Sequence, residues 1–134
     1  MLNMNSQRID QAVTEKRALV LGEVDSSTIQ QMEEQLGLHF SEDYTFFLKQ
    51  YGAASIEEHE VFGHAPSTHL DVVENTIQER NRASSLEKMV VIENPGYDGI
   101  LIVMDSSGQV YEFNNQELKL IHTSFESYLE DILN

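Results

Sequence analysis

The sequence contains no cysteine and no tryptophan, and it has only two prolines among its 134 residues. Without cysteine the chain can form neither a disulfide framework nor a thiolate zinc site, and this composition fits a reducing cytoplasm. The first twenty residues lack an apolar stretch of signal-peptide length, and no later stretch is long enough to span a membrane. We therefore expect a cytoplasmic protein.

Basic residues are scarce as well. Eight lysines and arginines stand against 23 aspartates and glutamates, which gives a formal net charge of −15. A field of this sign repels phosphate backbones and anionic lipids, so we expect neither direct nucleic-acid binding nor membrane binding. The acidic excess has two interpretations: a well-solvated surface, or a surface that attracts a basic protein partner.

The length and composition are those of a single globular domain. Hydrophobic residues make up 40% of the chain and charged residues 23%, and no repeat or low-complexity tract divides the sequence. We expect one domain over residues 1–134, with a helical N-terminal extension at 1–25 and a core at 26–134.

Several segments combine apolar residues at helical spacing with residues that start or stop helices. In the clearest case Ser41 precedes two carboxylates, and Tyr44, Phe47 and Tyr51 then fall on one face before Gly52. The pattern predicts helices at 6–20, from Ser27 to Gly37, from Ser41 to Gly52, at 71–82, and from Thr123 towards residue 134.

The pattern changes after residue 88 to short apolar runs separated by turn residues. These runs predict strands at 89–92, 100–104, 110–113 and 118–121, and a loop entering a brief strand at 56–63. Helices followed by consecutive strands and a closing helix are typical of an α+β domain, here with a largely antiparallel sheet.

The sequence carries no motif typical of covalent catalysis or of cofactor binding. It has no G-x-S-x-G sequence, no cysteine and no glycine-rich phosphate loop. Pairs of carboxylates are too frequent in this chain to indicate acid–base catalysis. We therefore predict a protein that is not an enzyme and that needs no cofactor.

Three histidines offer an alternative, because His59, His64 and His69 follow one another at intervals of five. A metal site could use them together with Glu57, Glu60 or Asp71, as in a small hydrolase. However, an interval of five does not place side chains on one helix face, and we favour ordinary surface histidines.

Two turn-like segments carry residues that the fold does not obviously require. Glu57, Glu58 and Glu60 form an acidic cluster, and Tyr97 and Asp98 lie in the turn at 94–99. Tyrosine beside a carboxylate is a plausible interface anchor, although the ring could equally fold back onto the core.

The order and spacing of several motifs are similar to those of the SUKH superfamily, which includes the yeast cell-wall-synthesis regulator. The resemblance covers residues 29–133, and one departure is Ser41, where the family often has proline. The similar segments are 29–38, 41–48 with 51–52, 61–63, 71–80, 98–99, 108–111 and 124–129.

The resemblance implies an α+β domain without shared catalytic residues and, for bacterial members, an immunity protein that binds and neutralises a toxin, often a nuclease. The alternative is a regulatory scaffold for an endogenous partner, as in eukaryotic members. The sequence leaves open whether the free protein is a monomer or a homodimer. The predicted partner-binding residues are Glu57, Glu58, Glu60, Tyr97 and Asp98, with Arg80 as a further candidate.

Overall fold

The computed structural model describes residues 4–134, so the first three residues of the predicted N-terminal extension lie outside the described residues. It shows an α+β domain, as predicted, but its strands form two antiparallel sheets where the sequence predicted one. The elements are α1 (Met4–Thr14), β1 (Ala18–Val20), α2 (Ser26–Leu36), α3 (Glu42–Tyr51), β2 (Ala54–Ile56), β3 (His59–Val61), α4 (Val72–Arg82), the 3-10 turn η1 (Ser84–Leu86), β4 (Val90–Glu93), β5 (Leu101–Met104), β6 (Val110–Asn114), β7 (Glu117–His122) and α5 (Phe125–Leu133).

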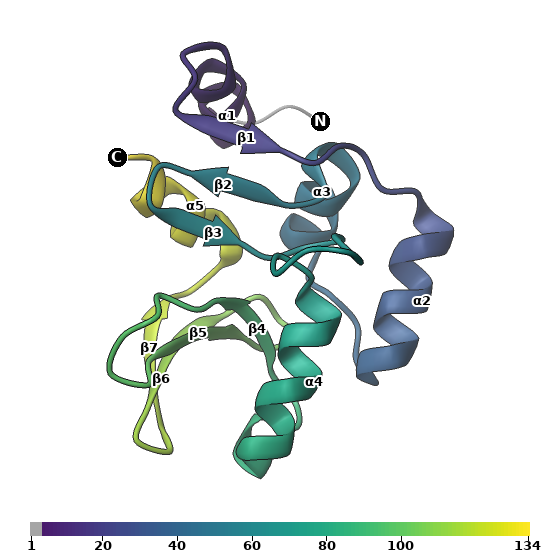
Figure 1. Cartoon of the computed structure of the whole chain (residues 1–134), viewed down its shortest axis with the longest axis vertical. Coiled ribbons are helices and arrows are strands. Elements are labelled where there is room, and N and C mark those ends of the chain that lie inside the picture. The colour runs from purple at the N-terminus through teal and green to yellow at the C-terminus, as the bar shows by residue number, and fades with distance from the viewer. Residues whose placement is uncertain (1–3) are drawn as a thin grey trace.

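The two sheets lie next to each other, and helices cover them (Figure 1). The smaller sheet has the order β1-β2-β3 and the larger has the order β4-β5-β6-β7. A backbone hydrogen bond of 2.8 Å from the Phe62 N–H to the Ile92 carbonyl links the end of β3 to β4. Within residues 4–134 no helix is both long and apolar enough to cross a bilayer.

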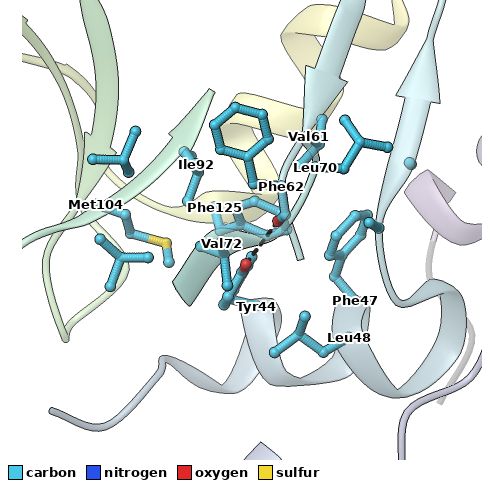
Figure 2. Close-up of a cluster of buried hydrophobic side chains, with 14 of the residues drawn as sticks. Tyr44, Phe47, Leu48, Val61, Phe62, Leu70, Val72, Ile92, Met104 and Phe125 are labelled. Carbon is cyan, nitrogen blue, oxygen red and sulfur yellow. Dashed lines mark hydrogen bonds between the residues drawn. The ribbon is translucent and has the colours of Figure 1, made fainter. Parts of the chain in front are cut away.

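Aromatic rings form the centre of the core, where α3 meets α5 (Figure 2). The Phe125 ring meets the rings of Tyr44 and Phe47 edge-on, at centroid distances of 5.0 and 5.3 Å. This is the geometry that aromatic quadrupoles prefer. The buried Tyr44 hydroxyl donates a 2.7 Å hydrogen bond to the Phe62 carbonyl, so the only polar atom of that side chain is paired.

One carboxylate caps two helices at once. Asp43 Oδ1 accepts from the backbone N–H of Tyr44 at 2.9 Å, in the first turn of α3. Its Oδ2 accepts from the backbone N–H of Glu126 at 3.1 Å, in the first turn of α5. Because both helix starts leave N–H groups without intrahelical partners, Asp43 fixes the position of α5 relative to α3.

The prediction of a helix at 6–20 is wrong for the second half of that range. α1 ends at Thr14, Lys16 takes a left-handed φ of 63°, and residues 18–20 form β1, which pairs with β2. The apolar stripe splits accordingly: Ile9 is buried in the core, whereas Leu19 is 74% exposed. Pairing with a strand more than thirty residues away overrides the local helical pattern.

Two predicted helix starts are displaced. α2 is capped by Asp25, which accepts from the Thr28 N–H at 2.8 Å, rather than by Ser27. α5 is capped by Ser124 rather than by Thr123. Neighbouring residues with equivalent capping oxygens make such displacements common. The predicted brief strand near residue 60 is β3, but its partner β2 was not predicted.

Candidate partner-binding surface

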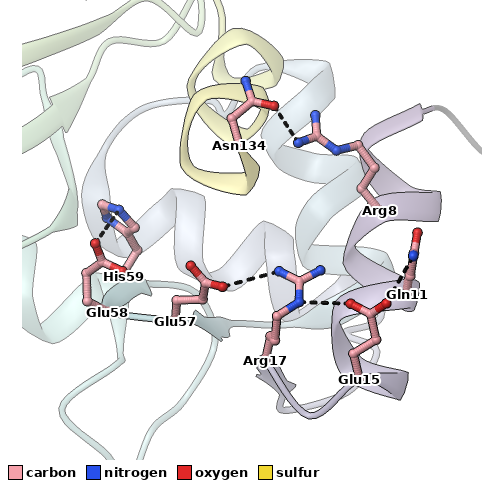
Figure 3. Close-up of polar contacts among 8 residues, drawn as sticks. All are labelled: Arg8, Gln11, Glu15, Arg17, Glu57, Glu58, His59 and Asn134. Atoms are coloured by element: carbon pink, nitrogen blue, oxygen red, sulfur yellow. Dashed lines mark hydrogen bonds and ion pairs between the residues drawn. The ribbon is translucent and has the colours of Figure 1, made fainter.

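Glu57 and Glu58 form the two-residue turn between β2 and β3, because Ile56 pairs with His59. Glu57 takes a left-handed φ of 53°, and its N–H donates to the Arg17 carbonyl at 2.9 Å. Arg17 Nη1 lies 3.3 Å from Glu57 Oε1 (Figure 3). Both side chains are a little under half exposed, so this pair contributes little to stability and leaves Glu57 accessible.

A chain of hydrogen bonds connects this hairpin to the core. His59 Nδ1 lies 2.9 Å from Glu93 Oε2, and the Tyr128 hydroxyl donates to Glu93 Oε1 at 2.5 Å. Glu93 and Tyr128 are almost fully buried. Burial, and next the charge of Glu93, raise the pKa of Tyr128 well above its usual value. On the solvent side His59 Nε2 is 3.8 Å from the exposed Glu58 carboxylate (Figure 3).

The three evenly spaced histidines do not converge. His59 contacts Glu93, His69 Nε2 lies 2.7 Å from Glu60 Oε2, and His64 lines a groove between α2 and α4. Within residues 4–134 no group of three or more His, Cys, Asp or Glu residues is arranged to hold a metal ion. Each histidine therefore acts within its own local environment.

Tyr97 and Asp98 lie at the tip of the connection between β4 and β5. The Asn94 side chain accepts from the Gly96 N–H at 2.9 Å, and the Ile100 N–H donates to the Tyr97 carbonyl, which shapes the turn. Asp98 has a left-handed φ of 54°. Tyr97 is 60% exposed, so its ring points into solvent and does not fold back onto the core.

The β2–β3 hairpin and the β4–β5 turn protrude from the same side of the molecule, on the left in Figure 1. We refer to their residues Glu57, Glu58, Glu60, Tyr97 and Asp98 as the acidic edge. The hydrogen bonds that join β3 to β4 hold the two protrusions in fixed relation. Three carboxylates and one aromatic ring are exposed there, whereas the fourth carboxylate, that of Glu60, is partly exposed and lies 2.7 Å from His69.

Arg80 lies elsewhere. Its Nη1 donates to the Leu36 carbonyl at 2.8 Å and its Nη2 to the Met89 carbonyl at 3.0 Å, so it links the end of α2 to the residue before β4. Burial lowers the pKa of this guanidinium, and its buried Nε has no hydrogen-bond partner among the described residues. Because Arg80 is used inside the fold, we do not include it in the acidic edge.

Sequence reasoning missed two features of the structure: the link from His59 through Glu93 to Tyr128, and, away from the acidic edge, the groove between α2 and α4. The link joins residues more than thirty positions apart. Its one available signal was a glutamate directly after the apolar run at 90–92, where a buried charge needs a partner.

The family match agrees with the motif order noted in the sequence. A family model described as SMI1-KNR4 cell-wall matches the chain over residues 1–134. No curated protein matches the chain. The matched region includes every described helix and strand, and the α+β architecture with two antiparallel sheets is that of a SUKH domain. The chain therefore belongs to the SUKH_5 family of SMI1-KNR4 cell-wall domains.

Proposed function

We propose that the chain is an immunity protein, or antitoxin, that neutralises a cognate toxin by stoichiometric binding and without catalysis. Membership of the SUKH_5 family supports this class of function, because SUKH domains are known as immunity proteins. The proposal places the protein in the cytoplasm and includes a resemblance to the Bacillus immunity protein YobK. It takes the partner to be a toxin with a basic surface, such as a nuclease.

The observation that carries the proposal is the acidic edge. Glu57 and Asp98 both occupy left-handed conformations, which glycine adopts at lower cost than any residue with a side chain. Glu58 and Tyr97 are strongly exposed and are not needed to fill the core. Other residues at these positions would give the fold equal or higher stability. Residues of this kind are typical of a surface that serves binding.

The chemistry of the edge fits a basic partner. A net charge of −15 and the carboxylates of the acidic edge attract a positively charged protein during diffusion and raise its association rate. Tyr97 can then insert its ring into a pocket of the partner, as aromatic anchors do at interface centres. A nuclease must itself present positive charge to bind phosphates, so the edge complements its substrate-binding surface.

The direct test uses the toxin encoded beside the gene. Co-expression should restore growth, and calorimetric titration of the purified pair should give tight binding with a fixed stoichiometry. If there is neither rescue nor binding, the immunity function is wrong, and a regulatory scaffold for an endogenous partner becomes the better hypothesis. Analytical ultracentrifugation of the free protein would establish whether it is a monomer or a homodimer.

Neutralising the hairpin should slow association. We expect the triple variant Glu57→Gln, Glu58→Gln and Glu60→Gln to associate roughly tenfold more slowly with the toxin at low salt, because electrostatic steering raises association rates by one to three orders of magnitude. The difference should shrink as salt screens the charges. Stopped-flow kinetics at several ionic strengths measure both effects.

A matched control removes the same charge from other parts of the surface. Glu23, Glu34 and Glu87 are exposed and lie outside the acidic edge, so their triple change to glutamine should alter the association rate much less. Equal slowing by both triple variants would show that total charge acts without a local binding edge.

A second prediction separates binding from stability. Glu57→Gly and Asp98→Gly relieve the strain of a left-handed backbone conformation. The free energy of unfolding of each variant should therefore equal that of the parent protein or exceed it by up to about 1 kcal/mol. Both should nevertheless bind the toxin more weakly, because each removes a carboxylate. Urea unfolding and calorimetry measure the two quantities. Unchanged affinity in both variants would contradict a role for these turns in binding.

A further inference from the structure

A groove of about 400 Å³ lies between α2 and α4. Figure 1 shows α2 on the right, whereas the β2–β3 hairpin and the β4–β5 connection that carry the acidic edge protrude on the left. Met32 and Val73 form its buried floor, and Ile77 forms a wall while remaining 42% exposed. A second hollow of about 410 Å³ adjoins it at α4 and shares Pro66, Glu74 and Gln78 with it. Two adjoining hollows of this size suit a segment of polypeptide better than a compact ligand.

Three glutamines line the groove: Gln31 and Gln35 from α2 and Gln78 from α4. None of their side-chain amides has a hydrogen-bond partner within the described part of the chain. Each amide offers two donors and an acceptor, which match the backbone N–H and C=O groups of an extended segment. A bound helix would not use them, because its backbone groups already bond to one another.

The charged side chains that line the groove determine which charge a bound polypeptide segment should carry. Asp71 and Glu74 contribute carboxylates, and no lysine or arginine lines either hollow. Asp71 is already occupied, because it accepts hydrogen bonds from the backbone N–H groups of Ala65 and Glu74. The exposed Glu74 carboxylate has no ion pair within residues 4–134, so it can receive a cationic side chain beside the apolar floor.

We propose that the groove between α2 and α4 binds an extended segment of a partner protein in which apolar residues alternate with lysine or arginine. The apolar side chains contact Met32, Val73 and Ile77, the glutamines bond the segment's backbone, and a cation lies beside Glu74. Methionine adapts its shape to different apolar side chains, which suits such a floor. The site goes beyond toxin neutralisation, because it lies between α2 and α4, away from the acidic edge.

The test uses a defined probe, the peptide acetyl-Gly-Lys-Leu-Lys-Leu-Lys-Gly-amide, and the full chain. Amide chemical shifts should change at 28–35 and 73–78 on titration, and fluorescence anisotropy of a labelled peptide gives the affinity. We expect Ile77→Glu to weaken binding about tenfold through loss of the apolar wall, and Glu74→Gln about threefold through loss of the charge. A peptide with glutamate in place of lysine should not bind.

Leu120→Glu is the matched control. Leu120 on β7 is 47% exposed, so this change adds the same charge at an equally exposed apolar residue away from the groove, and binding should not weaken. An equal loss in this variant, or shift changes concentrated at the acidic edge, would overturn the proposal. Because the probe is not a toxin, failure of toxin rescue leaves this test unaffected.

Discussion

Replacing Gly63 by alanine should cost on the order of 4 kcal/mol of folding free energy and leave little or no folded protein. A Cβ at this position would come closer to the Gly52 carbonyl oxygen than the 3.0 Å that Cβ atoms respect. That oxygen cannot move away easily, because it accepts a 3.0 Å hydrogen bond from the His64 N–H. The added methyl group would therefore clash with backbone atoms, which cannot turn away as the end of a flexible side chain can.

Gly63 itself is held from the other side. Its N–H donates to the Leu70 carbonyl at 3.0 Å, and its carbonyl accepts from the Val72 N–H at 2.8 Å. Neither segment can shift without breaking hydrogen bonds near the start of α4. A domain with a total stability of about 5–15 kcal/mol has little reserve against such a loss.

The matched control is Gly96→Ala. Gly96 has a φ of 85°, but no other atom lies within 4 Å of the position that a Cβ would take, so alanine there meets only conformational strain of about 1 kcal/mol. Urea unfolding followed by circular dichroism compares the two variants. If Gly63→Ala loses no more stability than Gly96→Ala, the close approach of the two chain segments is not a constraint on this fold.

Alkaline pH should unfold the protein steeply between about pH 10 and 12. Burial raises the pKa of Tyr44 and Tyr128 well above the usual 10.0, and the charges of Asp71 and Glu93 add to it. Burial first, and then the hydrogen bond to Asp10, raise the pKa of Tyr51 to about 12. All three hydroxyls act as hydrogen-bond donors in the fold.

The direction of this change in stability with pH follows from the number of protons that each state binds. Below about pH 10 the folded and unfolded chains both keep these protons, so the tyrosines give no pH dependence. Above it the unfolded chain releases them while the folded chain retains them, and stability falls as the pH rises. Three such groups give a slope of about 4 kcal/mol per pH unit.

Urea unfolding at several pH values between 9 and 11.5 measures the slope, and phenolate absorbance near 295 nm should rise together with unfolding. This pH interval includes the usual tyrosine pKa of about 10. Tyr51→Phe should reduce the slope by about a third, because it removes one of the three protons. A stability that does not change over this range would contradict the buried donor role of these hydroxyls.

Most of the fold could be predicted because its signals are local. The start of α3 depends on Ser41 and its end on Gly52, and α4 begins directly after Asp71, all within one helical turn of the residues they control. The four strands of the larger sheet follow one another through short turns, so each apolar run pairs with the next.

The smaller sheet could not be predicted in the same way. β1 and β2 have three residues each, and Ala18 meets Ile56 across almost forty positions of sequence. No local pattern encodes such a pairing. The acidic edge was proposed from composition and turn chemistry, but the solvent exposure of Tyr97 and the internal use of Arg80 depend on tertiary packing.

The connection from Tyr128 through Glu93 to His59 has a consequence for the entropy of binding. The buried end of this connection is fixed by the core, and its other end lies in β3, directly beside the turn that carries Glu57 and Glu58. A hairpin already held in one conformation loses little freedom when a partner docks on it. Preorganisation of this kind lengthens the lifetime of a complex, because the bound shape is also the shape of the free protein.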